Sequence, residues 1–167
     1  MSALTEDELD LVRRSFRAFA ASSEESAATF YERLFAMAPG IRRLFPADIG
    51  DQCTKLMSML GVIVAQLHDH ASLQPLLADL ARRHVGYGAL PEHYMGVGEA
   101  LLWALGRRLG EDFTPAHELA WRRAYAAPAG FLADRLQHRV LQRGIGAAPG
   151  QLMRRGEVLA ETASQGP

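Results

Sequence analysis

One histidine in this chain lies in a sequence context that would suit a side chain that binds a metal or haem iron. His84 ends an apolar helix face, and glycines follow it at positions 86 and 88. The rest of that face is made of Leu76, Leu77, Leu80 and Ala81. An imidazole placed there is either a core histidine bonded to a carbonyl or a ligand of a metal or haem iron, whose second ring nitrogen is held by an acceptor. The residues alone leave both explanations open.

A second candidate set precedes it in the chain. Gln52, Lys55 and Leu56 are spaced at i, i+3 and i+4, so they share one face of a predicted helix. They would offer an amide, a cation and an apolar surface to a ligand, but an ordinary amphipathic edge has the same pattern. Tyr31 lies on an apolar stripe in FYERLF, where it is either a core tyrosine with a bonded hydroxyl or a donor to a ligand.

The composition excludes several other kinds of site. Cys53 is the only cysteine, so the chain forms neither an intramolecular disulfide nor a cysteine metal cage. A net charge of −1 gives no field that attracts nucleic acid or an anionic membrane. The other histidines have no i, i+4 partner, and no glycine-rich loop follows a strand. We therefore expect neither a nucleic-acid nor a membrane partner.

The elements that must position these residues are helices. The chain is 49% apolar and its 167 residues suffice for one core. Thr5 with Glu8, and Ser22 with Glu25, have capping-box spacing, and Pro91 suits the start of a helix. We predict an all-α domain of seven or eight helices over residues 1–143, followed by a flexible tail over residues 144–167.

The N-terminal segment predicts the compartment. MSALTEDELD is acidic and has no apolar core, unlike a signal peptide. No apolar run approaches the roughly 20 residues of a membrane span. We expect a cytoplasmic protein.

Four stretches, in the correct order, resemble the globin family, and the resemblance covers roughly residues 5–140. FYERLFAMAPGIRRLF is similar to the globin B and C helices, DQCTKL to the start of the E helix, ARRHVGYGALPEHYMGVGEALL to the F and G helices, and RLGEDFTPAHELAWRRAY to the entry of the H helix. Gln52 and His84 are 32 residues apart, as are the distal and proximal residues of bacterial single-domain globins and flavohaemoglobins. The resemblance implies a globin fold, a three-over-three helical sandwich around a haem pocket.

The resemblance also assigns roles to single residues. It implies that His84 is the proximal ligand of haem b and that Phe45 stacks on the haem. It implies that Tyr31 and Gln52 are the distal hydrogen-bond donors and that Leu56 is the apolar residue over the iron. The other cofactor contacts that we expect are Lys55 at a haem propionate, Tyr94 beside the proximal histidine, and Val97 on the same helix as Tyr94.

The function implied by the resemblance is reversible dioxygen binding, for delivery, storage or scavenging. Nitric oxide dioxygenase is an alternative for which we expect an external reductase, because we expect no flavin or NAD module. A haem-based gas sensor acting through the tail is another. The flavohaemoglobin pattern has a glutamate on the last helix, where this chain has Leu136 with Asp134 nearby, and this departure favours oxygen binding. The expected ligands are dioxygen, NO and CO, and we expect a monomer or a homodimer.

Overall fold

The computed structural model describes residues 4–143, and these form six α-helices and two short 3₁₀ helices without a strand. In chain order the elements are α1 (Glu6–Ala20), α2 (Ser23–Met37), η1 (Pro39–Leu44), α3 (Gly50–Gln66), α4 (His70–Gly86), α5 (His93–Leu109), η2 (Gly110–Asp112) and α6 (Pro115–Arg143). The predicted all-α class is confirmed. The predicted tail, residues 144–167, lies outside the described residues, as does any sensing role that depends on it.

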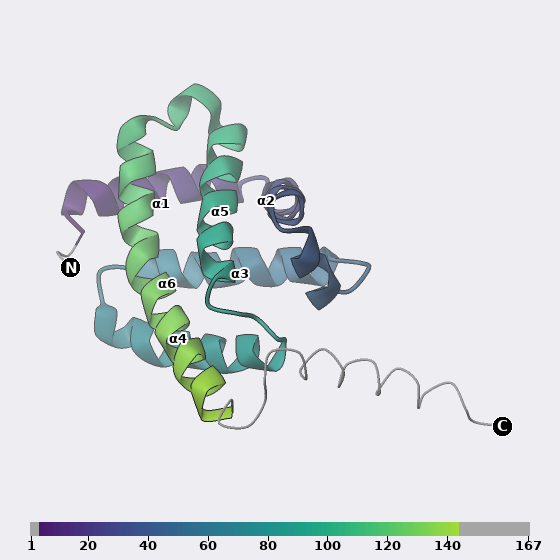
Figure 1. The fold of residues 1–167 in the computed structure, drawn as a ribbon. Helices are drawn as coiled ribbons and strands as arrows, with labels where there is room; N and C mark the ends of the chain where they lie inside the picture. The colour runs from purple at the N-terminus through teal and green to yellow at the C-terminus, as the bar shows by residue number, and fades with distance from the viewer. Residues whose placement is uncertain (1–3, 144–167) are drawn as a thin grey trace.

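The helices form two crossing layers (Figure 1). Helices α1, α3 and α4 run across the view, and α5 and α6 run down it in front of them, with α2 seen end-on beside α5. Helices α3 and α4 lie one above the other and run in opposite directions. This is the three-over-three arrangement that the resemblance implies, and α3 and α4 carry Gln52 and His84.

The helix starts confirm part of the predicted capping. The Thr5 hydroxyl accepts from the Glu8 N–H at 3.2 Å, while the Glu8 carboxylate accepts from the Thr5 N–H at 2.8 Å, so a capping box opens α1. Ser22 precedes α2, but its side chain makes no capping bond. The Ser22 backbone has ψ of 60° instead of the extended value of 162° found at Thr5, so Ser22 lacks the extended backbone typical of a capping residue.

A buried polar contact joins α1 to α6 across the core. The Trp121 indole N–H donates to the Ser15 hydroxyl at 2.9 Å, and that hydroxyl donates to the Leu11 carbonyl at 2.7 Å. Glu8 and Arg123 form an ion pair between the same two helices. Together these contacts hold the long helix α6 against the first helix.

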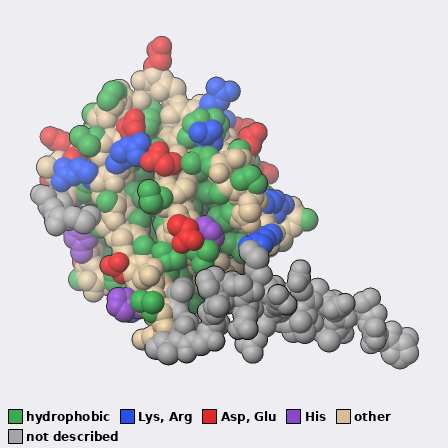
Figure 2. Space-filling model, in the orientation of Figure 1, with side chains coloured by type: hydrophobic (Ala, Val, Ile, Leu, Met, Phe, Trp, Pro, Cys, Tyr) green, Lys and Arg blue, Asp and Glu red, His purple; other side chains and the backbone are tan. Residues whose placement is uncertain are grey.

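The surface carries charges of both signs. Figure 2 shows acidic and basic side chains interspersed over the visible face of the molecule, with apolar side chains between them. None of the helices in the described part of the chain is long and apolar enough to cross a membrane.

Candidate functional site

His84 is positioned on the last turn of α4 by a bond to its own helix. Its Nδ1–H donates to the Leu80 carbonyl at 2.8 Å, a carbonyl one turn earlier. That bond assigns a proton to Nδ1, because a carbonyl only accepts, so in the neutral ring Nε2 is the unprotonated nitrogen with a free lone pair. The ring is half-buried, and burial lowers the pKa of the imidazole below its ordinary value of 6.5. His84 is therefore a neutral imidazole with one nitrogen available to a ligand.

Two tyrosine rings lie against the imidazole. The Tyr94 ring, from the start of α5, has its centroid 5.9 Å from that of His84, and the Tyr87 ring lies at 6.3 Å. Tyr94 is buried, whereas Tyr87 is 62% exposed. The Tyr94 hydroxyl is buried without a hydrogen-bond partner, and burial raises its pKa to about 12. The Tyr94 ring thus lies beside His84, and its role toward a haem ligand stays a prediction.

A tight turn follows the histidine. The Ala89 N–H donates to the His84 carbonyl at 3.0 Å, and Gly88 has a φ of +79°, which L-residues rarely adopt. A Cβ placed on Gly88 would lie 3.7 Å from the Leu44 Cδ2, in ordinary contact. Gly88 thus turns the chain and brings this turn beside Leu44 at the end of η1.

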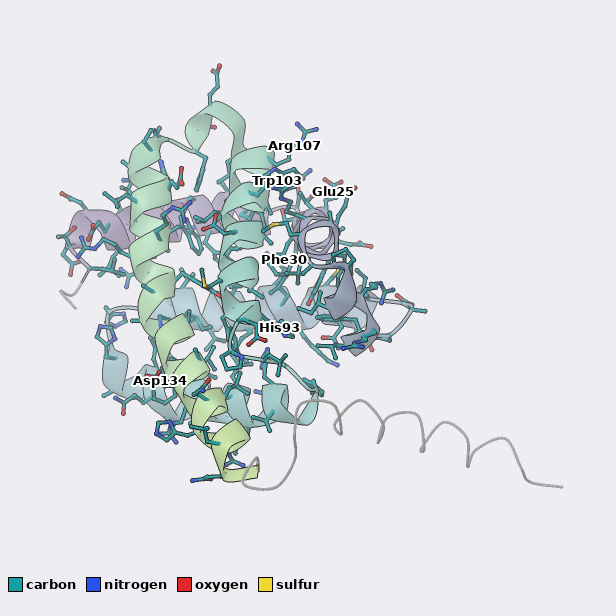
Figure 3. The ribbon with its side chains drawn as sticks, viewed as in Figure 1. Glu25, Phe30, His93, Trp103, Arg107 and Asp134 are labelled. Atoms are coloured by element: carbon teal, nitrogen blue, oxygen red, sulfur yellow. The ribbon has the colours of Figure 1, made fainter. Side chains whose placement is uncertain are left out.

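An aromatic cluster forms the other part of the candidate site. Tyr31 is 5% exposed, and its ring stacks on Phe35 at 5.7 Å and meets Phe45 edge-on at 5.5 Å. The Phe35 and Phe45 rings also meet, at 5.3 Å. Figure 3 shows the adjacent Phe30 on the side of α2 that faces α5, and its ring packs on Tyr31 at 5.0 Å. The three rings of Tyr31, Phe35 and Phe45 therefore form one apolar wall.

The Tyr31 hydroxyl bonds to α3. It donates to the backbone carbonyl of Gln52 at 3.3 Å, which is a long bond. Burial raises the pKa of the phenol far above its usual range, so the hydroxyl stays a neutral donor. The structure thus brings Tyr31, Phe45 and Gln52 together, although Gln52 contributes its backbone carbonyl and not its amide to this contact.

The other predicted contact residues lie on α3 and α5. Leu56 on α3 and Val97 on α5 are both half-buried and pack against the core, and Lys55 is exposed on α3. The lysine position suits a side chain that reaches a charged group at the rim of a site. The roles of these three residues toward a cofactor stay predictions.

The sequence left open whether Leu136 or Asp134 lies where the flavohaemoglobin pattern has a glutamate on the last helix. Leu136 is fully buried, and Asp134 is exposed on α6 (Figure 3). Among the described residues, no carboxylate contacts His84 or the Tyr94 hydroxyl. The imidazole is held by a neutral carbonyl alone.

Four of the other histidines make side-chain contacts of their own. The His93 Nδ1 accepts from the Leu90 N–H at 3.1 Å and so shapes the start of α5, two residues after the predicted start at Pro91 (Figure 3). Two further ring contacts are local, namely His117 with Thr114 and His138 with the Asp134 carbonyl, whereas His68 contacts Arg13 of α1, 55 residues earlier in the chain. Within residues 4–143 there is no group of three or more His, Cys, Asp or Glu side chains that could hold a metal ion.

Sequence reasoning missed two partners of the site. Phe35 completes the aromatic wall, and its i+4 spacing from Tyr31 was a signal that could have found it. Tyr125 donates from its hydroxyl to the Tyr94 carbonyl at 2.7 Å, and no local pattern shows that contact, because it joins two helices.

The chain is similar to known proteins along most of its length. A family model described as Globin matches residues 28–131. The Flavohemoprotein of Rhodopirellula baltica is 33% identical over 134 residues, which are 78% of this chain and 32% of that protein. The Neuroglobin of Tetraodon nigroviridis is 26% identical over 140 residues, 75% of this chain and 88% of that protein. The chain thus spans about a third of the length of the Flavohemoprotein relatives that it matches.

One solved structure is also close in fold. It is an engineered carbene transferase made from a candidate nitric oxide dioxygenase of Rhodothermus marinus. It is 29% identical to this chain with a TM-score of 0.75, and the match covers 85% of this chain and 99% of that one.

Proposed function

The chain belongs to the globin family, whose members bind haem, and we propose that it holds haem b through His84 and binds dioxygen reversibly on the Tyr31 side. The observation that carries this proposal is the state of His84. A neutral, half-buried imidazole with Nδ1–H on the Leu80 carbonyl and Nε2 free is the form that ligates iron. When bound, haem would supply an iron that can take a small gas as a ligand.

The residues of the site fit this group. The apolar wall of Tyr31, Phe35 and Phe45 suits a flat, largely apolar ring, and it keeps water away from the gas-binding side. Leu56 and Val97, both half-buried, are proposed to pack on the haem, and Lys55 is proposed to meet a propionate at the rim.

The Tyr31 hydroxyl is the proposed donor to dioxygen. Its present acceptor, the Gln52 carbonyl, lies at 3.3 Å, so the exchange of this bond for a shorter one to a negatively polarised ligand is favourable. The Gln52 side chain, half-buried on the same turn of α3, is proposed as a second donor.

The proximal side supports oxygen binding over oxidation chemistry. A carboxylate acceptor on Nδ1–H makes an imidazole a stronger electron donor, and a neutral carbonyl does so less. Among the described residues, His84 has only the Leu80 carbonyl as a hydrogen-bond partner, and Leu136, the residue at the position where the flavohaemoglobin pattern has a glutamate, is buried and apolar. His84 therefore donates weakly to the metal, which suits a gas that must be released unchanged.

Nitric oxide dioxygenase is the second candidate. The likeness to Flavohemoprotein relatives and to a candidate nitric oxide dioxygenase favours it. In this alternative the same Tyr31 and Gln52 hold dioxygen while NO reacts, and a separate reductase returns the electron used in each cycle.

Stopped-flow mixing separates the two functions. The oxygenated protein is mixed with NO, and turnover is then followed with a flavin reductase and NADH. Oxygen binding alone predicts one turnover at most per haem, with no sustained NO consumption above that of reductase alone. Sustained NO consumption that requires the globin would establish the dioxygenase and overturn our preference.

A further inference from the structure

The ring of Tyr125 on α6 lies directly on Gly98 of α5. A Cβ built on Gly98 would lie 2.6 Å from the Tyr125 Cε1 and 2.9 Å from its Cδ1, distances that side chains do not tolerate. Glycine in the middle of a helix weakens the helix relative to alanine, so a close packing contact explains its presence at position 98. Gly98 is the position at which α5 makes room for the Tyr125 ring.

That close approach lets the tyrosine hydroxyl reach the backbone one turn away. The Tyr125 hydroxyl donates to the Tyr94 carbonyl at 2.7 Å. Tyr94 and Gly98 are four residues apart, so ring and hydroxyl together span one turn of α5. The hydroxyl is neutral, since burial raises the pKa of Tyr125 above its usual range. A well-formed bond therefore fixes the first turn of α5 to α6.

The residue held in this way is the one that packs on His84. The Tyr94 ring lies 5.9 Å from the imidazole at an interplanar angle of 42°. Its own hydroxyl is buried and has no partner, so no hydrogen bond of the side chain orients the ring. The position of the Tyr94 ring is thus set by its backbone and by packing.

The imidazole needs such a contact. One hydrogen bond, from Nδ1 to the Leu80 carbonyl, fixes one ring atom but leaves the tilt of the ring plane free. Of the two tyrosines against it, Tyr87 is 62% exposed and Tyr94 is buried, so Tyr94 is the more rigid wall. No carboxylate contributes to the orientation of His84 in the described part of the chain.

We propose that Tyr125 is a positioning residue. Its hydroxyl bond to the Tyr94 carbonyl and the packing of its ring on Gly98 fix the Tyr94 ring against His84. This inference rests on the proposed function in that His84 is taken as the haem ligand. It assigns the orientation of the ligand to uncharged contacts between α4, α5 and α6.

The first test removes one atom. Tyr125→Phe keeps the ring on Gly98 and loses only the hydroxyl bond, so the variant should fold. In the ferrous haem-loaded protein, measured by resonance Raman spectroscopy, we expect the iron–imidazole stretching band to shift or broaden relative to wild type. Tyr87→Phe is the matched control, since it also alters a tyrosine on the His84 ring, and it should leave the band unchanged. An unchanged band in Tyr125→Phe, whatever its melting temperature, overturns the proposal.

The second test displaces the ring by a side chain. Gly98→Ala places a methyl group where the Tyr125 ring lies, so the iron–imidazole stretching band should again shift or broaden relative to wild type. Gly96→Ala is its control on the same helix, because a Cβ there meets nothing within 4 Å. If both alanines change the band equally, the Tyr125 contact is not the cause.

A third measurement separates this inference from the proposed function. If wild type bound no haem, the proposed function would fail, but the positioning would still be measurable in the haem-free chain. The ¹⁵N chemical shifts of the His84 ring should then change in Tyr125→Phe and stay constant in Tyr87→Phe. Equal shifts in both variants and wild type would overturn the positioning role on its own.

Discussion

The hydroxyl of Tyr31 is the group whose removal should change oxygen binding most selectively. Tyr31→Phe keeps the ring that packs on Phe35 and Phe45, so the aromatic wall stays in place. In the protein without a gas ligand it removes only a 3.3 Å bond to the Gln52 carbonyl. We therefore expect the free energy of unfolding to change by less than about 1 kcal/mol.

The size of the functional effect follows from an exchange of partners. Dioxygen held by ferrous haem draws negative charge onto itself, and a hydrogen bond to a charged acceptor contributes about 1.5–3 kcal/mol. The hydroxyl gives up its weak bond to the Gln52 carbonyl to make it, so the net gain is about 1–2 kcal/mol. Since about 1.4 kcal/mol is a factor of ten, Tyr31→Phe should speed dioxygen release about 5- to 30-fold.

The assay is stopped-flow displacement of dioxygen by excess CO, for wild type and Tyr31→Phe. CO carries little charge, so its own dissociation rate should change much less than that of dioxygen. Tyr87→Phe, an exposed tyrosine on the other side of the site, should change neither rate. A change in dioxygen release below about twofold, or an equal change for CO, would refute the argument that the phenol stabilises charge on the ligand.

Three further changes test the frame around the site. Ser15→Ala leaves the buried Trp121 N–H without its acceptor and should lower the free energy of unfolding by about 1–3 kcal/mol in a urea titration, whereas no loss would contradict the bond. The pKa of Glu8 is lowered, chiefly by the Thr5 backbone N–H, so its stabilisation is present above the unfolded value of 4.5 and is lost as the pH falls through the folded value. Glu8→Gln should therefore be less stable than wild type at pH 7, with a gap that closes under acid, and a gap independent of pH would count against this. Gly88→Ala forces a φ of +79° on an L-residue and should lower the melting temperature, with a cost of about 1–2 kcal/mol, and an unchanged melting temperature would show that the turn relaxes.

The proximal side could be predicted from the sequence because its signals are local. His84 ends an apolar face and is followed by a break, which marks the end of a helix whatever the tertiary fold. Its hydrogen-bond acceptor, the Leu80 carbonyl, is one turn away in the same helix. The resemblance then supplied what local signals lack, namely that Tyr94 comes back beside the ring.

The contacts between helices could not be predicted in the same way. Gly98 looks like a helix-weakening residue until the Tyr125 ring is placed on it, and that placement depends on how α5 and α6 cross. Gln52 was expected to act through its amide, yet the backbone of the same residue takes the Tyr31 bond. Residue types indicate which chemistry is present, and the crossing of the helices decides which atoms meet.

The most direct measurement is the absorption spectrum of the purified protein, with haem added, in the ferric, ferrous and ferrous-CO states. The account predicts a Soret band in each state, and it predicts that His84→Ala loses the wild-type spectrum and regains it when imidazole is supplied in solution. A protein without a Soret band, or a His84→Ala variant with an unchanged spectrum in all three states, would contradict the central claim that His84 holds the haem.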